Sequence, residues 1–422
     1  MTGGGIVSLI RHQPPHSFRT DPVVTNKLKE FESGLVRGRY YANFEAVAEA
    51  FADNLQNRED KGAAFALYHH GEPVVDIWGG FADASTGKPW QENTVALMFS
   101  AAKGLTATCL LRLVDAGQLD IDLPICHYWP EFAANGKADI TTRMVLAHRA
   151  GLAAVEGELT LAEILNWDPV VGAIAAQAPN WEPDSTHGYH ARSFGWILGE
   201  LLRRITGETL GSFLNREIAA VAGLRLWIGL PKDELPHCAR IIPPAGNANA
   251  AAEILGENSL TARVMSGPNK QFGYNDMWNR AEILQAEMPS SNGVGDARSM
   301  ARFYAALNGD IAGLPTLSPA LLETARTVQS RGPDAVILHD TCFGLGYSLQ
   351  PMVAPGAGPN CYGHPGAGGT TAFADPDNGV AMAYLTNTMR FDPEGDPRSA
   401  NLIQAAYQSL ASTGGQAPGF FG

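Results

Sequence analysis

Strand-like segments lie near both ends of this 422-residue chain and enclose a long middle part of helical character, and this order constrains the fold most strongly. Residues 64–68 and 73–80 flank a tight turn and predict a β-hairpin. Residues 344–349, 370–375 and 379–386 predict further strands near the other end. The pattern therefore predicts one α+β domain, built from both ends of the chain, with an inserted helical region.

We divide the chain into parts on this basis. Residues 1–40 are polar and contain proline, and we expect them to form an arm that packs over the body. Residues 41–118 and 311–422 are expected to form the α/β domain, and residues 119–310 a helical domain with irregular insertions. Three stretches have the apolar spacing and the end signals of helices: residues 193–205, 297–307 and 398–410.

Charge and cysteine content exclude several classes of function. The net charge is −13 and no basic run occurs, which argues against nucleic acid and anionic membranes as partners. No stretch reaches the roughly 20 apolar residues of a membrane span. The first residues lack the apolar region of a signal peptide, so we expect a cytoplasmic protein. The cysteines form no C-x-x-C pair, which favours free, buried thiols over disulfides or a metal site: Cys109, Cys126, Cys238, Cys342 and Cys361.

Ser100 and Lys103 stand where an apolar run becomes a helix that continues to Asp115. Residues three apart lie on one face of a helix, so the Lys103 amine can reach the Ser100 hydroxyl. A serine becomes a nucleophile when a base takes its proton, and a lysine is such a base only if burial or a neighbouring cation keeps it neutral. The alternative is a helix-capping serine beside a surface lysine, because the S-x-x-K pattern also occurs by chance.

Two further segments carry groups that suit acyl transfer. Tyr189 precedes a predicted helix, and near two cations the pKa of its phenol would fall, which suits a base or a proton relay. Residues 362–369 are rich in glycine, and Pro365 predicts an edge strand that faces a cleft. The backbone N–H of Ala367 could then bind an oxyanion together with that of Ser100. The plainer interpretations are a packed aromatic ring and a glycine-rich loop.

In chain order, these motifs resemble the three motifs of the serine β-lactamase-like enzymes, which include class C β-lactamases, D-specific peptidases and family VIII carboxylesterases. The resemblance lies in Ser100-Ala101-Ala102-Lys103, Tyr189 and His364-Pro365-Gly366. No G-x-S-x-G nucleophile elbow occurs, which disfavours an ordinary α/β-hydrolase. The resemblance implies an antiparallel sheet flanked by helices and formed by both chain ends, and a mostly helical domain that faces it across the active site.

The resemblance also implies a role for each matching residue. Ser100 would be the acylated nucleophile and Lys103 its activating base. Tyr189 would act with Lys103 in moving protons to the leaving group and later from the deacylating water. Backbone N–H groups of Ser100 and Ala367 would form the oxyanion hole, whereas His148 is interpreted as structural. The substrate would meet four residues: His364, Gly366, Phe99 and Trp181.

Two positions depart from the pattern of the family's β-lactamases. Those enzymes have an asparagine two residues after the tyrosine, where this chain has Ala191. Their third motif begins with lysine, where His364 offers at most a weaker, pH-dependent charge. Both changes remove groups that recognise β-lactams and peptides. With the unsignalled N-terminus, they favour a carboxylesterase that acts on small, short-acyl esters and needs no cofactor.

Other functions stay open at this stage. A β-lactamase, D-peptidase or amidase would use the same residues, and so would an enzyme that transfers the acyl group to an alcohol or amine. A catalytically silent relative that binds a ligand is a further possibility. The natural ester and the oligomeric state are not predicted. Residues 225–290 have no assigned fold, although we expect parts of them to form walls of the pocket.

Overall fold

The structure is a computed structural model that describes residues 29–31, 34–245, 250–314, 317–392 and 395–412. Its strands are β1 Lys29–Phe31, β2 Gly34–Tyr40, β3 Gly62–His69, β4 Glu72–Asp83, β5 Lys88–Pro89, β6 Ala96–Phe99, β7 Leu226–Ile228, β8 Gly293–Gly295, β9 Ser330–Pro333, β10 Asp340–Phe343, β11 Ser348–Leu349, β12 Tyr362–Pro365, β13 Thr371–Asp375 and β14 Val380–Thr386. Its α-helices are α1 Glu45–Asn57, α2 Ala102–Asp115, α3 Thr142–Leu146, α4 Leu161–Leu165, α5 Asp168–Ala176, α6 Ser193–Thr206, α7 Leu210–Leu214, α8 Ala220–Ala222, α9 Ala250–Leu255, α10 Leu260–Ser266, α11 Ala281–Gln285, α12 Ala297–Leu307, α13 Pro319–Ala325 and α14 Pro397–Ser412. Short 3₁₀ or π turns are Ala42–Phe44, Ile125–His127, Pro130–Ala133, Asn215–Ala219, Lys232–His237, Asp276–Asn279 and Ala367–Gly369.

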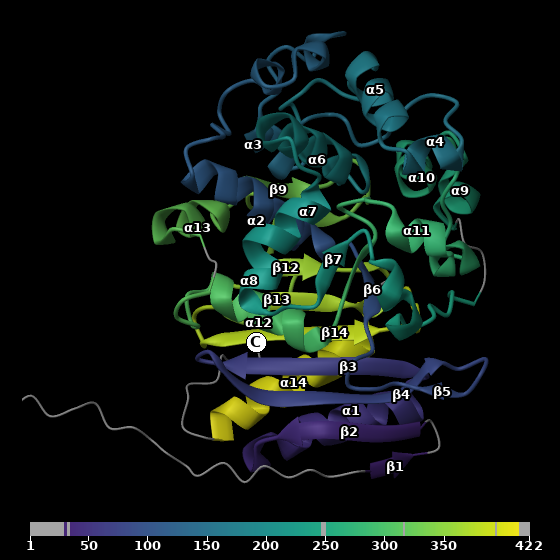
Figure 1. The fold of residues 1–422 in the computed structure, drawn as a ribbon, viewed down its shortest axis with the longest axis vertical. Helices are drawn as coiled ribbons and strands as arrows, with labels where there is room; N and C mark the ends of the chain where they lie inside the picture. The colour runs from purple at the N-terminus through teal and green to yellow at the C-terminus, as the bar shows by residue number, and fades with distance from the viewer. Residues whose placement is uncertain (1–28, 32–33, 246–249, 315–316, 393–394, 413–422) are drawn as a thin grey trace, which may run out of the picture.

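Both ends of the chain build one antiparallel sheet, as predicted. Its strand order is β1-β2-β4-β3-β14-β13-β12-β11-β10-β9, and β5 pairs with β4. The strands from the two halves of the chain meet where β3 pairs with β14, with Phe65 opposite Tyr384 and Ala63 opposite Thr386. The predicted hairpin is β3 and β4, which turn at His70 and Gly71 with positive φ at both residues. The α+β prediction is therefore confirmed (Figure 1).

Helices cover both faces of this sheet. On one face, α1 and α14 pack against each other and bury Phe51 and Leu402 with Phe65 of β3 in one apolar cluster. Period-two alternation sends Ala66 of the same strand to the opposite face, where it joins a second and larger cluster. That cluster includes Phe303 of α12 and continues into the helical region, shown above the sheet in Figure 1.

The prediction of an arm over residues 1–40 is wrong for residues 34–40, which form β2 at the edge of the sheet and pair with β4. Val36 and Tyr40 are buried while Arg37 and Arg39 are exposed, which is the alternation of a half-buried strand. Residues 1–28 lie outside the described residues.

Two assignments in the second half of the chain are also corrected. The helix predicted over residues 297–307 has the expected bounds, but α12 packs on β3, β13 and β14 and so belongs to the sheet domain rather than to the helical one. Of the strand predicted over residues 344–349, only Ser348–Leu349 form a strand, β11. Residues 344–347 instead form the turn that follows β10, where Gly346 adopts a left-handed conformation.

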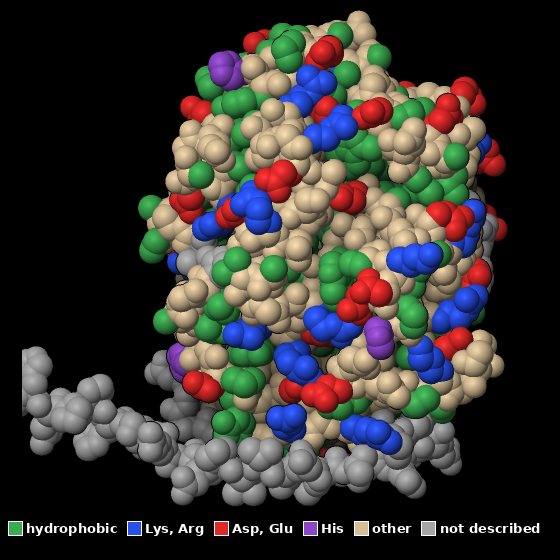
Figure 2. Space-filling view, viewed as in Figure 1, with side chains coloured by type: hydrophobic (Ala, Val, Ile, Leu, Met, Phe, Trp, Pro, Cys, Tyr) green, Lys and Arg blue, Asp and Glu red, His purple; other side chains and the backbone are tan. Residues whose placement is uncertain are grey.

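A second, three-stranded sheet, in the order β6-β8-β7, lies where the helical region meets the main sheet. Its middle strand β8 runs close against α2, since a Cβ on Gly293 would lie 2.5 Å from Ala102 Cβ. This contact sets the position of the β6–α2 junction that holds Ser100. Among the described residues, no helix has the length and apolar character needed to cross a membrane. Figure 2 shows acidic and basic side chains interspersed over the visible face.

Candidate active site

Ser100 lies in a tight turn between β6 and α2. The residue before it, Phe99, has φ +48°, a left-handed conformation that is strained for a side chain of this size. The Phe99 ring is buried and meets Trp278 and Tyr274 edge-on, with ring centroids 5.0 and 6.0 Å away. Ala101 is the N-cap of α2, and the Lys103 N–H donates to the Ser100 carbonyl over 2.9 Å. The turn directs the Ser100 side chain into a cavity.

The structure brings Ser100, Lys103 and Tyr189 together, although Tyr189 is 89 residues away along the chain from Ser100. Lys103 Nζ lies 3.3 Å from Ser100 Oγ, and Tyr189 Oη lies 2.7 Å from the same atom. The amine is also 2.7 Å from the Ala191 carbonyl and 3.0 Å from the Ser290 carbonyl. One serine oxygen is thus in contact with an amine and a phenol.

The surroundings of Lys103 favour its neutral form. The side chain is 0% exposed. Burial, and next the positive charge of Arg192, lower the Lys103 pKa well below its usual value. A neutral amine has two N–H donors, which match the carbonyls of Ala191 and Ser290. Its lone pair is then free to accept the Ser100 hydroxyl proton.

Tyr189 differs from our expectation in its ionisation. The prediction of a lowered pKa is wrong, because burial of the phenol raises the Tyr189 pKa above its usual value. Its ring stacks on Phe343, with centroids 6.2 Å apart, and its backbone N–H donates to Asp334 Oδ1 over 3.0 Å. Tyr189 is therefore a fixed, protonated phenol whose O–H donates to Ser100 Oγ.

Two histidines behind Tyr189 are structural. His148 is buried, and its Nδ1 accepts a hydrogen bond of 3.1 Å from the His190 N–H, in agreement with the prediction for His148. His190 Nε2 accepts from the Leu152 N–H over 3.0 Å, and its Nδ1 lies 2.7 Å from the Gly188 carbonyl. Burial lowers the pKa of His190 to about 4, so the ring is neutral near pH 7 and fixes the loop that carries Tyr189.

Strand β12 brings residue 367 to the cavity. The strand ends against β6, since a Cβ on Gly366 would lie 2.2 Å from the Met98 carbonyl oxygen. Ala367 then lines the same cavity as Ser100. The prediction that Pro365 marks an edge strand is wrong, because β12 pairs with both β11 and β13. Pro365 is tolerated because the pairing of β12 with β11 ends at Gly363, opposite Ser348, so no strand on that side needs an N–H group from residue 365.

His364 carries no charge at neutral pH. The side chain is 3% exposed, and burial, with a smaller contribution from Lys103, lowers its pKa to about 3. Its Nδ1 lies 2.7 Å from the Pro365 carbonyl, and its ring centroid is 6.0 Å from that of Tyr189. The expectation of a weak, pH-dependent charge near neutrality is therefore wrong, because burial removes it.

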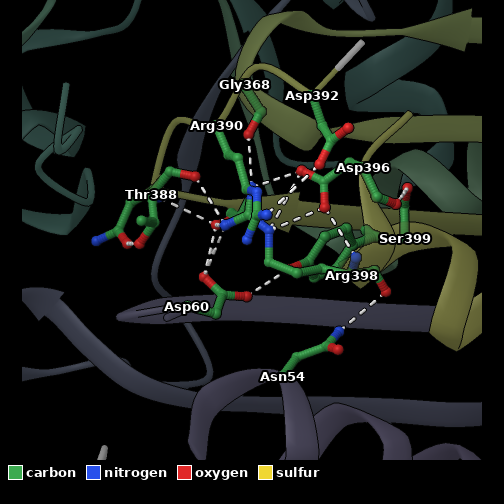
Figure 3. Close-up of polar contacts among 12 residues, drawn as sticks. Asn54, Asp60, Gly368, Thr388, Arg390, Asp392, Asp396, Arg398 and Ser399 are labelled. Atoms are coloured by element: carbon green, nitrogen blue, oxygen red, sulfur yellow. Dashed lines mark hydrogen bonds and ion pairs between the residues drawn. The ribbon is translucent and has the colours of Figure 1, made fainter. Parts of the chain in front are cut away.

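A buried ion-pair cluster holds the loop that follows Ala367 (Figure 3). Arg398, at the start of α14, donates to the Gly368 carbonyl over 2.9 Å and to the Thr388 carbonyl over 2.8 Å. Its charge is balanced by Asp396 at 2.6 Å and Asp60 at 3.6 Å. These contacts join the loop to β14, α14 and the start of β3, and so fix it relative to the sheet.

The cavity beside Ser100 has a volume of about 30 Å³, close to the space of one water molecule. Its lining is Phe99, Ser100, Tyr189, Ala191, Arg192, Met265, Tyr274, Trp278, Ser291 and Ala367. Residues 225–290 thus supply part of the wall, as predicted. Three residues predicted to contact substrate lie outside this lining: His364, Gly366 and Trp181. Trp181 packs instead near Gly188 and His190 and supports the Tyr189 loop.

Sequence reasoning did not single out Arg192, which also lines the cavity. The signal was its position three residues after Tyr189, just before the apolar helix α6. Among the described residues, no three His, Cys, Asp or Glu side chains lie close enough together to hold a metal ion. Cys109, Cys342 and Cys361 are buried free thiols, whereas Cys126 and Cys238 are partly exposed.

Comparison with known proteins gives consistent matches over most of the chain. A family model described as Beta-lactamase matches residues 47–407. Esterase/beta-lactamase LipL of Mycobacterium tuberculosis is 36% identical over 82% of this chain and 81% of LipL. The crystal structure of a family VIII carboxylesterase has a TM-score of 0.79 at 33% identity and covers 89% of this chain and 99% of its own. A penicillin-binding protein homologue from Caulobacter crescentus has a TM-score of 0.78 at 35% identity, with the same coverage.

Proposed function

The chain belongs to the beta-lactamase family and is a serine hydrolase, and from this premise we propose that it hydrolyses small, short-acyl carboxylic esters through an acyl-enzyme on Ser100. The observation that carries the proposal is the pair of contacts at Ser100 Oγ, with Lys103 Nζ at 3.3 Å and Tyr189 Oη at 2.7 Å. A neutral amine and a protonated phenol on one hydroxyl provide a base and an acid for the same reaction.

Acylation begins with Lys103 as the base. The neutral amine takes the Ser100 proton as Oγ attacks the ester carbonyl, which gives a tetrahedral intermediate and an ammonium ion. Ser100 and Ala367 both line the cavity, and their backbone N–H groups would stabilise the oxyanion. Tyr189 then gives its phenolic proton to the departing alcohol oxygen and recovers a proton from Lys103. The acyl group stays on Ser100.

Deacylation uses the same groups in reverse. A water takes the place of the alcohol, Tyr189 and Lys103 accept its proton as it attacks the acyl carbonyl, and Ser100 Oγ leaves with a proton from Lys103. The products are the free acid and the original hydroxyl.

Two features support an ester over a lactam or a peptide. Ala191 has no side-chain amide to hold the amide group of such a substrate. His364 is buried and neutral, so it gives no positive charge where the family's β-lactamases have a lysine. The relative with 33% identity and a solved structure is described as a carboxylesterase.

The test compares hydrolysis of p-nitrophenyl acetate by the wild type and by Ser100→Ala. We expect kcat of the variant to fall about 10⁴-fold or more, because removing one residue of a catalytic unit removes most of the rate enhancement of the whole unit. A fluorophosphonate should add its mass to the peptide that contains Ser100. Ser348→Ala is the matched control, because Ser348 is buried outside the cavity lining and its hydroxyl has no hydrogen-bond partner among the described residues. Equal turnover by the wild type and Ser100→Ala would contradict the proposal.

Hydrolysis of β-lactams is the second candidate, and it rests on the name of LipL, which includes both activities. The discriminating measurement is kcat/KM for a chromogenic cephalosporin against kcat/KM for p-nitrophenyl acetate. A preference for the cephalosporin would reverse our order. Acyl transfer to an alcohol would instead appear as a new ester when the alcohol is added to the assay. The cytoplasmic location stays a prediction.

A further inference from the structure

Arg192 is a buried cation in the wall of the Ser100 cavity and has no acidic partner among the described residues. The residue is 7% exposed. Nη1 donates to the carbonyls of Val264 and Met265, each over 2.9 Å, and the guanidinium carbon lies 4.6 Å above the Phe272 ring. Nε is buried without a hydrogen-bond partner, and Nη2 donates to no described residue.

A purely structural role explains only half of this arrangement. Nη1 holds two carbonyls at the end of α10, where carbonyl groups lack partners within the helix. Among the described residues, Nε and Nη2 of Arg192 have no acceptor, and an unpaired donor of a buried charge is costly. Nη2, unlike Nε, is not fully buried, so it is the donor that can form a charge-assisted hydrogen bond with a carboxylate that enters the cavity.

We propose that Arg192 binds a carboxylate of the substrate, so that the preferred ester carries one negative charge close to its scissile carbonyl. The inference rests on the proposed ester hydrolysis, because Arg192 and Ser100 line the same cavity and an ester bound at Ser100 would lie beside the guanidinium. The aromatic residues Phe99, Tyr274 and Trp278 line the same cavity. The substrate class is therefore a half-ester of a short dicarboxylic acid or an ester of a short hydroxy acid.

The experiment uses two pairs of esters that differ only in charge. Monoethyl succinate is paired with ethyl levulinate, which has a methyl ketone in place of the carboxylate and carries the charge difference on the acyl side. O-acetylglycolate is paired with its methyl ester, which places the charge difference on the alcohol side. Ester cleavage is followed by product chromatography for the wild type, Arg192→Met, Arg192→Lys and Ser100→Ala.

We expect the wild type to prefer the anionic ester of at least one pair by roughly 10- to 100-fold in kcat/KM, the strength of a charge-assisted hydrogen-bonded pair. Arg192→Met should bring that ratio close to one, and Arg192→Lys should keep part of it. Arg263→Met is the matched control, since Arg263 lies on α10 and pairs with Glu156 but does not line the cavity. This control should keep the wild-type ratio.

The outcomes separate the inference from the proposed function. A wild-type ratio near one in both pairs overturns the role of Arg192, as does an equal loss on the anionic and neutral esters in Arg192→Met, because a structural role lowers both alike. If the neutral esters are cleaved and Ser100→Ala abolishes this cleavage, the proposed function stands even when the role of Arg192 fails. If the wild type cleaves no ester of either pair, both are overturned.

Discussion

Replacing Tyr189 with phenylalanine removes one hydroxyl from the candidate site and leaves the ring in place. The lost contact is the 2.7 Å hydrogen bond from Tyr189 Oη to Ser100 Oγ. The ring would keep its stack on Phe343 and its contact with His148, whose centroids lie 6.2 and 5.1 Å away. We therefore expect a folded protein whose defect is confined to proton transfer.

The size of the defect depends on the leaving group. A positioned acid contributes about 10²- to 10⁴-fold, which corresponds to roughly 2.7 to 5.4 kcal/mol of barrier. Ethoxide is strongly basic and needs the proton of Tyr189 as it leaves, so kcat/KM for ethyl acetate should fall by about that factor. p-Nitrophenolate leaves without a proton, so kcat/KM for p-nitrophenyl acetate should fall less than about tenfold.

The assay measures kcat/KM for both esters, because this constant reports the acylation step. Tyr362→Phe is the matched control: Tyr362 is fully buried in β12 and its hydroxyl has no hydrogen-bond partner in the part of the chain that the structure describes. The rates on both esters should therefore stay unchanged in this variant. Equal losses on the two esters in Tyr189→Phe would show that Tyr189 is not the proton donor to the leaving group. An unchanged rate on ethyl acetate would refute the mechanism outright.

Three other predictions follow from the packing and the charges. Burial and then Arg192 lower the Lys103 pKa, so kcat/KM should stay high at pH values below the usual lysine pKa. As the pH is lowered further and Lys103 becomes protonated, kcat/KM should fall about tenfold per pH unit. A pH–rate profile in which kcat/KM already falls at the ordinary lysine pKa would contradict this. Gly366→Ala should cost about 1 to 3 kcal/mol of unfolding free energy and most of the activity, since its Cβ would lie 2.2 Å from the Met98 carbonyl oxygen; an unchanged denaturation midpoint would count against it. Arg398→Met leaves Asp396 without its buried partner, so urea denaturation should show a loss of about 3 to 5 kcal/mol, and a loss below about 1 kcal/mol would disprove the structural role.

The elements that the sequence predicted well are those with strong local signals. The helix over residues 297–307 ends at Asn308 and Gly309 as expected, because apolar spacing and a terminal glycine act within a few residues. The hairpin of β3 and β4 was visible for the same reason. In contrast, residues 34–40 were predicted to be part of an arm. Their alternation of Val36 and Tyr40 with two arginines is too short to identify a strand until the pairing with β4 is known.

Ionisation at the site could not be predicted from the sequence. The expected lowering of the Lys103 pKa agrees with the structure, where burial and a neighbouring cation have this effect, while its role as the base stays a prediction. The Tyr189 prediction failed because burial outweighs the nearby charges and raises the pKa of its phenol. The pKa of His364 falls to about 3 for the same reason. Burial is a property of the folded chain, and no motif carries it.

The sequence by itself determined which reactive groups this protein carries: the order of Ser100, Lys103, Tyr189 and the glycine-rich segment predicted an acyl-transfer site, because each group has a reactivity fixed by its own atoms. Only the tertiary structure decided how these groups meet. Folding places Tyr189 2.7 Å from a serine 89 residues away, and it excludes Trp181 from the cavity lining. It also leaves the Arg192 charge in the cavity wall. Distances and solvent exclusion arise from packing between distant segments, so they are set by the whole chain.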